Sequence, residues 1–420
     1  MKEIFNKENT RGLENKAHLI KIISSVAIIC AFAVVGLCFF FRPTYSENEK
    51  RNLTEFPKFT FESFLSGDYF SQISLWYSDT YPLREGMINA NSGIQSMYGD
   101  RDDQLIIPSG GNTTIENGGA VENFGGIWIQ NDTKTAYEIF YNRKSVNDRY
   151  ISAINDAADK LGSGVNVYNM VVPLHYTYKL TDEQIAQVGA SDCVDVMNYI
   201  YEGLDKNVTA VDIHPQLLAH RDEYIYFRTD HHWTARGAYY AYLAFCEEKG
   251  IKPTPLEDYT RLEFEDFLGT FYSQSGQNKT LKNNPDYVEA FVPSGTNVLT
   301  ATTKDGKQTE YAIVYKGAGK YSAANKYMCF IGGDNPVSEI HNKNIKDGSS
   351  IVVIKESYGN AFVPFLVDSY EYVYVIDYRY FDGNLIDFVE DNDVDDVLFL
   401  NYISTTSTES KIGQIEDIIG

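Results

Sequence analysis

Residues 228–234 and 355–360 together contain an acid, an imidazole and a hydroxyl, the three parts of a nucleophilic relay. A serine hydroxyl is a poor nucleophile at neutral pH. It needs a base within hydrogen-bond reach, and that base needs a partner that fixes its tautomer. Asp230, His232 and Ser357 have the right chemistry for acid, base and nucleophile. If residues 228–234 are extended, Asp230 and His232 project to the same side of the strand.

The surroundings of Ser357 are more informative than its identity. Residues 349–354 have the apolar pattern of a short buried strand, and residues 358–367 that of a helix. A serine at this junction lies close to the N–H groups of the first helical turn, which can hold a developing oxyanion. We expect the Gly359 N–H or the Asn360 side-chain amide to share that role.

Two other interpretations of the same residues stay open. In the first, Asp230 caps a helix that begins near Trp233, Ser357 is a helix N-cap, and the histidines are packed or at the surface. In the second, a zinc or iron ion is held by acidic and imidazole groups. We favour neither metal nor cofactor, because adjacent histidines diverge on a strand and no His-x3-His helical pair is present. The residues available to such a metal are Asp230, His231, His232, His214 and His220.

The tetrapeptide Asp-His-His-Trp at residues 230–233 resembles the signature of bacterial membrane-anchored proteins named for it, the DHHW family. That family is similar to the alginate O-acetylation proteins. Those proteins carry an Asp-Thr-His-Trp segment and a later Asp-Ser-Phe or Asp-Ser-Tyr segment within an SGNH-hydrolase-like domain. The resemblance implies that Asp230 is the acid, His232 the base and Ser357 the nucleophile, with Trp233 as a packing residue.

The chain departs from the usual patterns of these families in two respects. Glu356 precedes the serine where these families usually have Asp. The acid and base come before the serine, which reverses the usual SGNH order, and the alginate relatives share this permuted order. The resemblance extends to residues 46–53, 79–84 and 377–381, so it covers most of the chain after the N-terminal apolar segment.

Residues 22–41 run for 20 positions without a charge, about the length that crosses a bilayer as a helix. Basic residues before this segment predict that residues 1–21 are a cytoplasmic tail and that everything after Arg42 is extracellular. No small-x-small cleavage site follows the apolar segment, so we expect an uncleaved signal anchor and a single-pass membrane protein.

The charge of the remaining chain is strongly negative. Residues 1–41 hold 5 basic and 3 acidic residues, which leaves 31 Lys and Arg against 55 Asp and Glu. This balance argues against nucleic acid as a partner and is compatible with neutral glycans. Only Cys193, Cys246 and Cys329 lie outside the apolar segment, so at most one disulfide is possible among them and no disulfide framework is expected.

Residues 42–130 are expected to form a stalk and an entry subdomain, amphipathic from Phe61 to about Tyr98. From Ser145 the pattern alternates between helices and short apolar strands, which favours a parallel sheet covered on both faces. Residues 131–420 are therefore predicted to form an SGNH-hydrolase-like, flavodoxin-like α/β sandwich with a central parallel sheet. Antiparallel segments at about 252–326 predict a β-rich insertion that roofs the site. Predicted helices are 145–161, 182–204, 235–250 and 383–390; predicted strands are 126–129, 165–172, 208–213, 327–331, 372–376 and 397–401.

Ligands of such sheets bind at the carboxyl ends of the strands. By this rule, the residues after the strand that ends at Val172 are candidates for the rim of a binding site. They also fit a loop that has no catalytic role. Arg379 follows another strand end and is placed to contact an acyl group or substrate, or to pair with Asp377. Asn335, in the turn at residues 332–336, is a further oxyanion candidate. The rim candidates are Pro173, His175, Tyr176 and Lys179; further substrate-contacting candidates are His231 and Tyr358.

These observations favour an extracytoplasmic, membrane-tethered serine acyltransferase or esterase that O-acetylates a cell-surface or exported polysaccharide. The resemblance to the alginate proteins implies that a polytopic membrane O-acyltransferase delivers the acyl group. The alternative, favoured by Glu356, is a catalytically inactive glycan-binding or envelope-assembly protein of the same fold. The sequence leaves both open.

Overall fold

The computed structural model describes residues 21–27, 30, 34, 42–46, 51–61, 64, 68–82, 86, 87, 103–106 and 126–420. The chain divides into two compact units. The smaller consists of Met1–Asn91 with Ile115–Val121, and the larger of Ser92–Thr114 with Glu122–Gly420.

The larger unit is built on an eight-stranded sheet with the order β11-β10-β12-β14-β13-β15-β6-β7. The five strands from β14 to β7 are mutually parallel, and the three at the other edge are antiparallel. The strands are β6 (Asn166–Val172), β7 (Val208–Ala210), β10 (Val298–Thr302), β11 (Gln308–Ala312), β12 (Val337–His341), β13 (Ser350–Lys355), β14 (Tyr372–Asp377) and β15 (Asp396–Tyr402).

The expected parallel sheet is therefore only part of a mixed sheet. Half of the predicted β-rich insertion extends the central sheet and does not form a separate roof. β10 pairs antiparallel with β12 as well as with β11, which adds both strands to the central sheet. The Thr303 N–H donates to the Lys307 carbonyl at 2.8 Å, and Gly306 has a φ of +76°. This tight turn joins β10 directly to β11, and strands joined by a short turn can only pair antiparallel.

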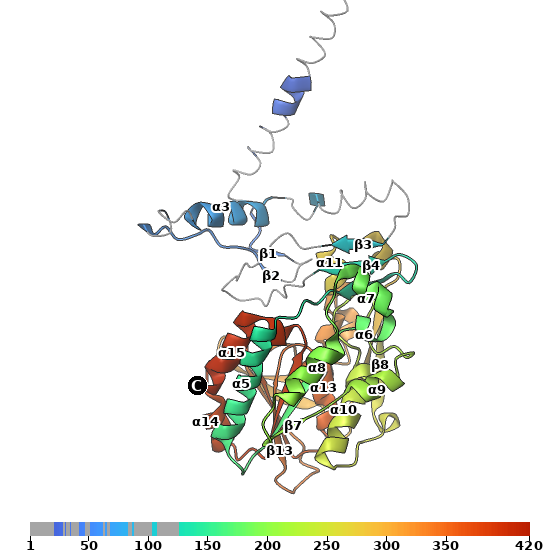
Figure 1. The fold of residues 1–420 in the computed structure, drawn as a ribbon, viewed down its shortest axis with the longest axis vertical. Helices are drawn as coiled ribbons and strands as arrows, with labels where there is room; N and C mark the ends of the chain where they lie inside the picture. Colours follow the sequence, from blue (N-terminus) through green and yellow to red (C-terminus); the bar gives the residue numbers. More distant parts are fainter. Residues whose placement is uncertain are drawn as a thin grey trace, which may run out of the picture. The chain divides into compact units, whose positions relative to one another are not determined.

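Helices cover both faces of the sheet, as the sequence predicts for an α/β sandwich. One group contains α5 (Lys144–Leu161), α8 (Cys193–Glu202), α14 (Leu385–Asp391) and α15 (Glu409–Ile419). The other contains α9 (His214–Ala219), α10 (Ala235–Lys249) and α13 (Gly359–Leu366). In Figure 1, α5, α14 and α15 lie side by side on the flank of the larger unit opposite to α9 and α10.

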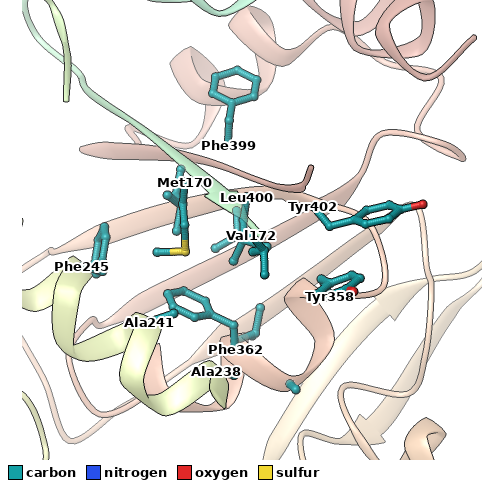
Figure 2. Close-up of a cluster of buried hydrophobic side chains, with 14 of the residues drawn as sticks. Met170, Val172, Ala238, Ala241, Phe245, Tyr358, Phe362, Phe399, Leu400 and Tyr402 are labelled. Atoms are coloured by element: carbon teal, nitrogen blue, oxygen red, sulfur yellow. The ribbon is translucent and has the colours of Figure 1, made fainter. Parts of the chain in front are cut away.

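The helices on both sides of the sheet explain why the central strands are mostly apolar. Figure 2 shows Met170 of β6 and Leu400 of β15 facing the apolar side of α10 and Phe362 of α13, whereas Phe399 points to the opposite face. Successive strand residues alternate between the faces, so a strand covered on both sides is apolar throughout. All seven residues of β15 are buried.

Two predicted elements were wrong in detail. The helix expected at residues 182–204 is two helices, α7 (Asp182–Val188) and α8. Gly189 adopts a left-handed φ of 66° after α7, and Asp192 caps α8 through the backbone N–H groups of Val194 and Asp195.

The strand expected at residues 327–331 is instead the end of a 3₁₀ helix, η5 (Ala323–Cys329). Ile331 has a φ of 45°, which interrupts an extended chain, so only a single bridge forms between Phe330 and Val314. The strand of the central sheet that follows is β12, for which the sequence analysis predicted no element.

Two smaller sheets complete the larger unit. One contains β3 (Gln104–Ile106), β4 (Ile127–Gln130) and β5 (Thr135–Glu138). The other pairs β8 (Thr260–Phe267) antiparallel with β9 (Asp286–Val292) and belongs to the predicted insertion. Short helices lie between these elements: α6 (Tyr176–Lys179), α11 (Thr270–Gln274), α12 (Lys279–Lys282), η3 (Leu256–Asp258), η4 (Ala318–Lys320) and η6 (Thr405–Ser407).

In the smaller unit the structure describes β1 (Tyr45–Ser46), β2 (Arg51–Asn52) and α3 (Asp68–Asp79). Within the part of the chain that is described, none of the helices has the length and apolarity to cross a membrane. The predicted anchor at residues 22–41 lies mostly outside the described residues, as do Arg84 and most of the loop at residues 109–126.

Candidate active site

Asp230 and His232 lie in a loop whose two ends pair as in a hairpin. Tyr226 and Trp233 form an antiparallel bridge, and the Thr234 N–H donates to the Ile225 carbonyl at 3.0 Å. Thr234 also caps α10 by accepting a hydrogen bond from the Gly237 N–H. The cap of this helix is therefore Thr234 and not Asp230, which leaves the Asp230 carboxylate for other partners.

Asp230, His231 and His232 lie in a bend, not in an extended strand. The adjacent histidines therefore do not diverge as they would on a strand: the two imidazole centroids are 3.7 Å apart, and His231 Nδ1 lies 3.7 Å from Asp230 Oδ1. The bend forms because Asp230 Oδ1 accepts the His232 backbone N–H at 3.0 Å, a turn that aspartate side chains make with the residue two positions on.

The three predicted catalytic side chains meet in space. His232 Nδ1 lies 2.5 Å from Asp230 Oδ1, and His232 Nε2 lies 2.7 Å from Ser357 Oγ. A carboxylate only accepts hydrogen bonds, so Nδ1 carries the proton and Nε2 is left as the acceptor for the serine hydroxyl. This is the tautomer that a general base toward Ser357 requires.

Asp230 is enclosed by the start of α11. The Thr270 N–H and hydroxyl donate to Asp230 Oδ2 at 2.8 and 3.1 Å. Burial raises the pKa of the Asp230 carboxyl, but the charges of His232 and His231 and the hydrogen bonds outweigh it, so the pKa lies well below its usual range. The acid is therefore ionised. A Cβ on Gly269 would lie 2.2 Å from Asp230 Cβ, so this approach requires glycine.

Ser357 lies between β13 and α13, as predicted. Gly359 begins the helix, and a Cβ there would lie 2.6 Å from Lys355 Cβ, so glycine allows the chain to turn sharply after the strand. Tyr358, not Ser357, is the N-cap residue. The Trp233 indole N–H donates to the Tyr358 carbonyl at 2.9 Å, and the Tyr358 hydroxyl donates to the His231 carbonyl. These two bonds hold the acid–base loop against the nucleophile.

Tyr327 supports the base from a third direction. Its ring stacks on His232 with centroids 4.1 Å apart and planes 13° apart, and its hydroxyl donates to the Ser357 carbonyl at 2.9 Å. The side chain comes from η5, the segment that the sequence analysis interpreted as a strand. It fixes the plane of the imidazole relative to the serine.

Comparisons with known proteins identify the family of this chain. The family model described as DHHW protein matches residues 49–109 and 106–376. The chain belongs to the DHHW family. A DHHW family protein from Eubacterium siraeum is similar in structure, with 34% identity and a TM-score of 0.63 over 70% of this chain and 96% of that one. A search of curated proteins found no match.

Two other solved structures are similar at lower identity, and the first shares the fold. Bacillus cereus PatB1, in a structure with a sulfonyl adduct, has 22% identity and a TM-score of 0.57 over 68% of this chain and 97% of that one. The O-acetyltransferase domain of Pseudomonas putida AlgJ has 13% identity and a TM-score of 0.34 over 68% of this chain and 96% of that one, a likeness too weak to carry an argument. The family resemblance inferred from the tetrapeptide is thus confirmed.

The expected oxyanion donors of this DHHW protein have other partners in the structure. The Gly359 N–H donates to the Glu356 carbonyl at 2.9 Å, and the Asn360 amide donates to Asp334 Oδ1 at 2.9 Å. Asn335 is buried and its amide donates to the Gly332 carbonyl at 3.4 Å. The Gly359 N–H would have to leave its partner to bind an oxyanion, whereas the side-chain amides of Asn360 and Asn335 each have a second N–H.

Arg379 belongs to an ionic cluster beside the nucleophile turn. Its guanidinium binds both carboxylate oxygens of Asp377 at 2.8 and 2.7 Å and reaches Asp334 at 3.0 Å. The Lys355 ammonium contacts the same two carboxylates, at 2.9 and 3.2 Å. Arg379 and Lys355 hold the pKa of Asp334 well below its usual range against the effect of burial. Arg379 therefore forms the contact with Asp377 that the sequence analysis gave as the alternative to substrate binding.

Glu356, the departure from the family pattern, is fully buried behind Ser357. Its carboxylate accepts the Tyr402 N–H at 2.8 Å, the Asn401 amide at 2.9 Å and the Tyr378 hydroxyl at 3.2 Å. Burial raises its pKa to about 7, although these donors oppose the change. The side chain ties the end of β13 to the end of the neighbouring strand β15.

Only three of the five residues considered as metal ligands lie close together. Asp230, His231 and His232 place potential ligand atoms within 4.8 Å of one another. Both His232 nitrogens are hydrogen-bonded, to Asp230 and Ser357, and a metal ion would have to replace those bonds. His214 instead stacks on Tyr178, and His220 stacks on Tyr240 and contacts Glu223.

The rim candidates after β6 have structural contacts. His175 stacks on Tyr226, and burial together with the charge of Lys179 lowers its pKa to about 3, so it is neutral. Tyr176 donates to the Ser191 carbonyl. Cys193, Cys246 and Cys329 are free and buried thiols, so the one disulfide that the sequence allowed is absent.

Sequence reasoning missed Gly269, Thr270, Tyr327 and Asp286. Asp286 accepts the Thr229 N–H at 2.7 Å and the Thr229 hydroxyl at 2.6 Å, and thereby fixes the residue before the acid. Gly269, Thr270 and Asp286 reach the site from the predicted insertion, and Tyr327 from the segment directly after it, all through tertiary contacts. A single sequence carries no periodic or motif signal for such positions.

Proposed function

We propose that this protein is an extracytoplasmic, membrane-tethered serine acyltransferase or esterase, and that it O-acetylates a cell-surface or exported polysaccharide. The observation that carries the proposal is the continuous contact from Asp230 through His232 to Ser357. In this arrangement the hydroxyl has an acceptor for its proton and the acceptor has a fixed tautomer.

In the first half-reaction, Ser357 Oγ attacks the carbonyl carbon of an acyl ester and its proton passes to His232 Nε2. Collapse of the tetrahedral adduct breaks the bond to the leaving alcohol, which takes the proton from the imidazolium. Asp230 stabilises the imidazolium, since its carboxyl remains ionised. The product is an ester of Ser357.

In the second half-reaction, a glycan hydroxyl gives its proton to His232 and attacks the acyl-serine carbonyl, and Ser357 recovers its proton. Attack by water instead gives hydrolysis. A polytopic membrane O-acyltransferase is our proposed source of the acyl group, and this rests on the family resemblance alone. PatB1 shares the fold, and its structure contains a sulfonyl adduct. This adduct is the one feature of the PatB1 comparison that supports acyl chemistry.

The covalent step is tested by mass spectrometry of the protein after exposure to a sulfonyl fluoride and, separately, to a small acetyl ester. We expect one adduct on the peptide that contains Ser357, none with Ser357→Ala, and a much slower reaction with His232→Ala. Equal labelling of wild type and Ser357→Ala refutes a serine nucleophile at this position.

The second candidate is an inactive glycan-binding or envelope-assembly protein, and the replacement of Asp by Glu356 is the feature that favours it. The two are separated by incubating the acetyl-loaded protein with chito- or xylo-oligosaccharides. Acetylated oligosaccharide supports the transferase. Oligosaccharide binding that survives Ser357→Ala, without any covalent adduct in the wild type, supports the binding protein.

A further inference from the structure

The smaller unit carries an exposed row of phenylalanines shortly after the predicted membrane segment. Between 42% and 70% of each side chain is exposed, although large apolar patches on soluble proteins are uncommon and mark interaction surfaces. We call this row the aromatic face. It consists of Phe56, Phe59, Phe61, Phe64 and Phe70.

Ring contacts join most of these residues. Phe59 lies 5.9 Å from Phe64 between ring centroids, and Phe64 lies 5.4 Å from Phe70 on α3. Phe56 packs edge-on against Trp76, also on α3, with centroids 4.8 Å apart. The exposed rings therefore share one support, the helix α3.

Arg42 connects this support to the predicted membrane segment, because it is the first residue after the apolar run at 22–41. Its guanidinium lies 4.0 Å from the centre of the Trp76 ring, a cation–π contact. It also donates to the Thr80 hydroxyl at 2.8 Å and to the Tyr77 carbonyl at 3.2 Å. The point where the chain leaves the apolar segment is thus fixed to α3, within the length of one side chain.

The sequence around the aromatic face has no excess of basic residues. Residues 42–82 contain four Lys and Arg against six Asp and Glu, so attraction to anionic headgroups is not the driving force for membrane contact. The driving force that remains is burial of aromatic rings at the boundary between headgroups and acyl chains.

We propose that the aromatic face inserts into the lipid surface from which the predicted anchor emerges, with phospholipid acyl chains as its partner. The smaller unit is then a membrane-surface platform and not a stalk that extends into solvent. This inference goes beyond the proposed acyl transfer and does not depend on it. It depends on the anchor, which the same experiment tests.

The test adds one tryptophan to the full-length protein in phosphatidylcholine vesicles, at Phe61→Trp in the aromatic face or at Tyr141→Trp as a matched control. Both positions are exposed, at 70% and 47%, and Tyr141 belongs to the larger unit. The fluorescence of the wild type is subtracted from that of each variant. Vesicles contain lipid brominated near the headgroup end of the acyl chain, or iodide is added to the water.

We expect flotation of both variants with the vesicles. At position 61 we expect a blue-shifted emission that loses most of its intensity to brominated lipid and little to iodide; position 141 gives the opposite pattern. Quenching of position 61 by iodide alone places the aromatic face in water and overturns the proposal. Quenching by neither reagent means that protein covers the aromatic face. Loss of flotation means that the protein has no membrane anchor. Either result also overturns the proposal. p-Nitrophenyl acetate hydrolysis, if present, is equal in both variants and wild type.

Discussion

At the scale of single residues, the acid of the relay depends on the absence of a side chain at Gly269. A methyl group there would lie 2.2 Å from both Asp230 Cβ and Oδ2. Gly269→Ala is expected to displace the carboxylate from His232 and to lower kcat of ester hydrolysis by at least about tenfold, because misplacement by 1 Å costs about a hundredfold. The measurement is kcat for p-nitrophenyl acetate.

Gly164→Ala is the matched control for this substitution, since nothing lies within 4 Å of a Cβ at that position. It is expected to retain wild-type kcat. If Gly269→Ala also retains wild-type kcat, Asp230 does not need its present position and its role as orienting acid is wrong.

Glu356 makes a prediction about pH, because burial raises its pKa from 4.5 to about 7. The folded protein binds this proton more tightly than the unfolded chain. The contribution of the group to stability is therefore fully present below pH 4.5 and is lost as the pH rises to 7. The loss is on the order of 3 kcal/mol, at 1.36 kcal/mol for each pKa unit.

Urea unfolding of the wild type and Glu356→Gln measures this effect, because glutamine does not titrate. The free energy of unfolding of the wild type minus that of the variant is expected to decrease between pH 5 and pH 8. A difference that stays constant over this range means that Glu356 has an ordinary pKa in the folded protein.

The residues of the relay could be predicted because their chemistry and short motifs are visible in the chain. Asp230 and His232 lie two positions apart, and Ser357 lies at a recognisable strand–helix junction. Gly269 and Tyr327 could not be predicted, since their importance comes from which atoms they approach after folding. The orientation of His231 was wrong because the Asp230 side chain bends its own backbone, a local hydrogen bond that strand periodicity ignores.

At the scale of elements, the start of β9 positions the acid–base loop through Asp286. This buried carboxylate pairs with the Arg228 guanidinium at 3.0 Å and also accepts the Thr229 N–H and hydroxyl. Asp286→Asn replaces one acceptor oxygen with an amide N–H group, which then faces the donors of Arg228 and Thr229. We expect a loss of about 2–3 kcal/mol of unfolding free energy, less than for a fully buried ion pair because Arg228 is partly exposed.

The control for Asp286→Asn is Asp305→Asn, which removes a carboxylate from the exposed pair with Lys307. Exposed pairs contribute little, so its unfolding free energy is expected to stay close to that of the wild type. Equal stability of the two variants contradicts the role assigned to Asp286.

The elements themselves were predictable where an apolar run is long and bounded, as in β6, β13 and α10. The prediction failed where one residue changes the path of the chain. Gly189 divides the expected helix 182–204, and Ile331 interrupts the expected strand at 327–331. The mixed sheet was missed because pairing of β10 with β12 is a tertiary contact, which strand propensity does not determine.

At the scale of the whole molecule, the prediction concerns sidedness. From the basic residues in 1–21 and the apolar segment that follows, we propose that the larger unit lies outside the cell. Protease added to intact cells is therefore expected to remove the C-terminal unit and to leave an N-terminal tag intact. Digestion of the tag, or protection of the C-terminal unit in intact cells, contradicts this orientation.

The central claim is that Asp230, His232 and Ser357 act together as a catalytic relay. The most direct measurement is p-nitrophenyl acetate hydrolysis by the full-length protein, Ser357→Ala, His232→Ala and the double variant. We predict that each single substitution lowers kcat by about a thousandfold or more and that the double variant is no slower, since members of a relay are not additive. Activity in Ser357→Ala equal to that of the wild type, or independent multiplicative losses in the double variant, contradicts the claim.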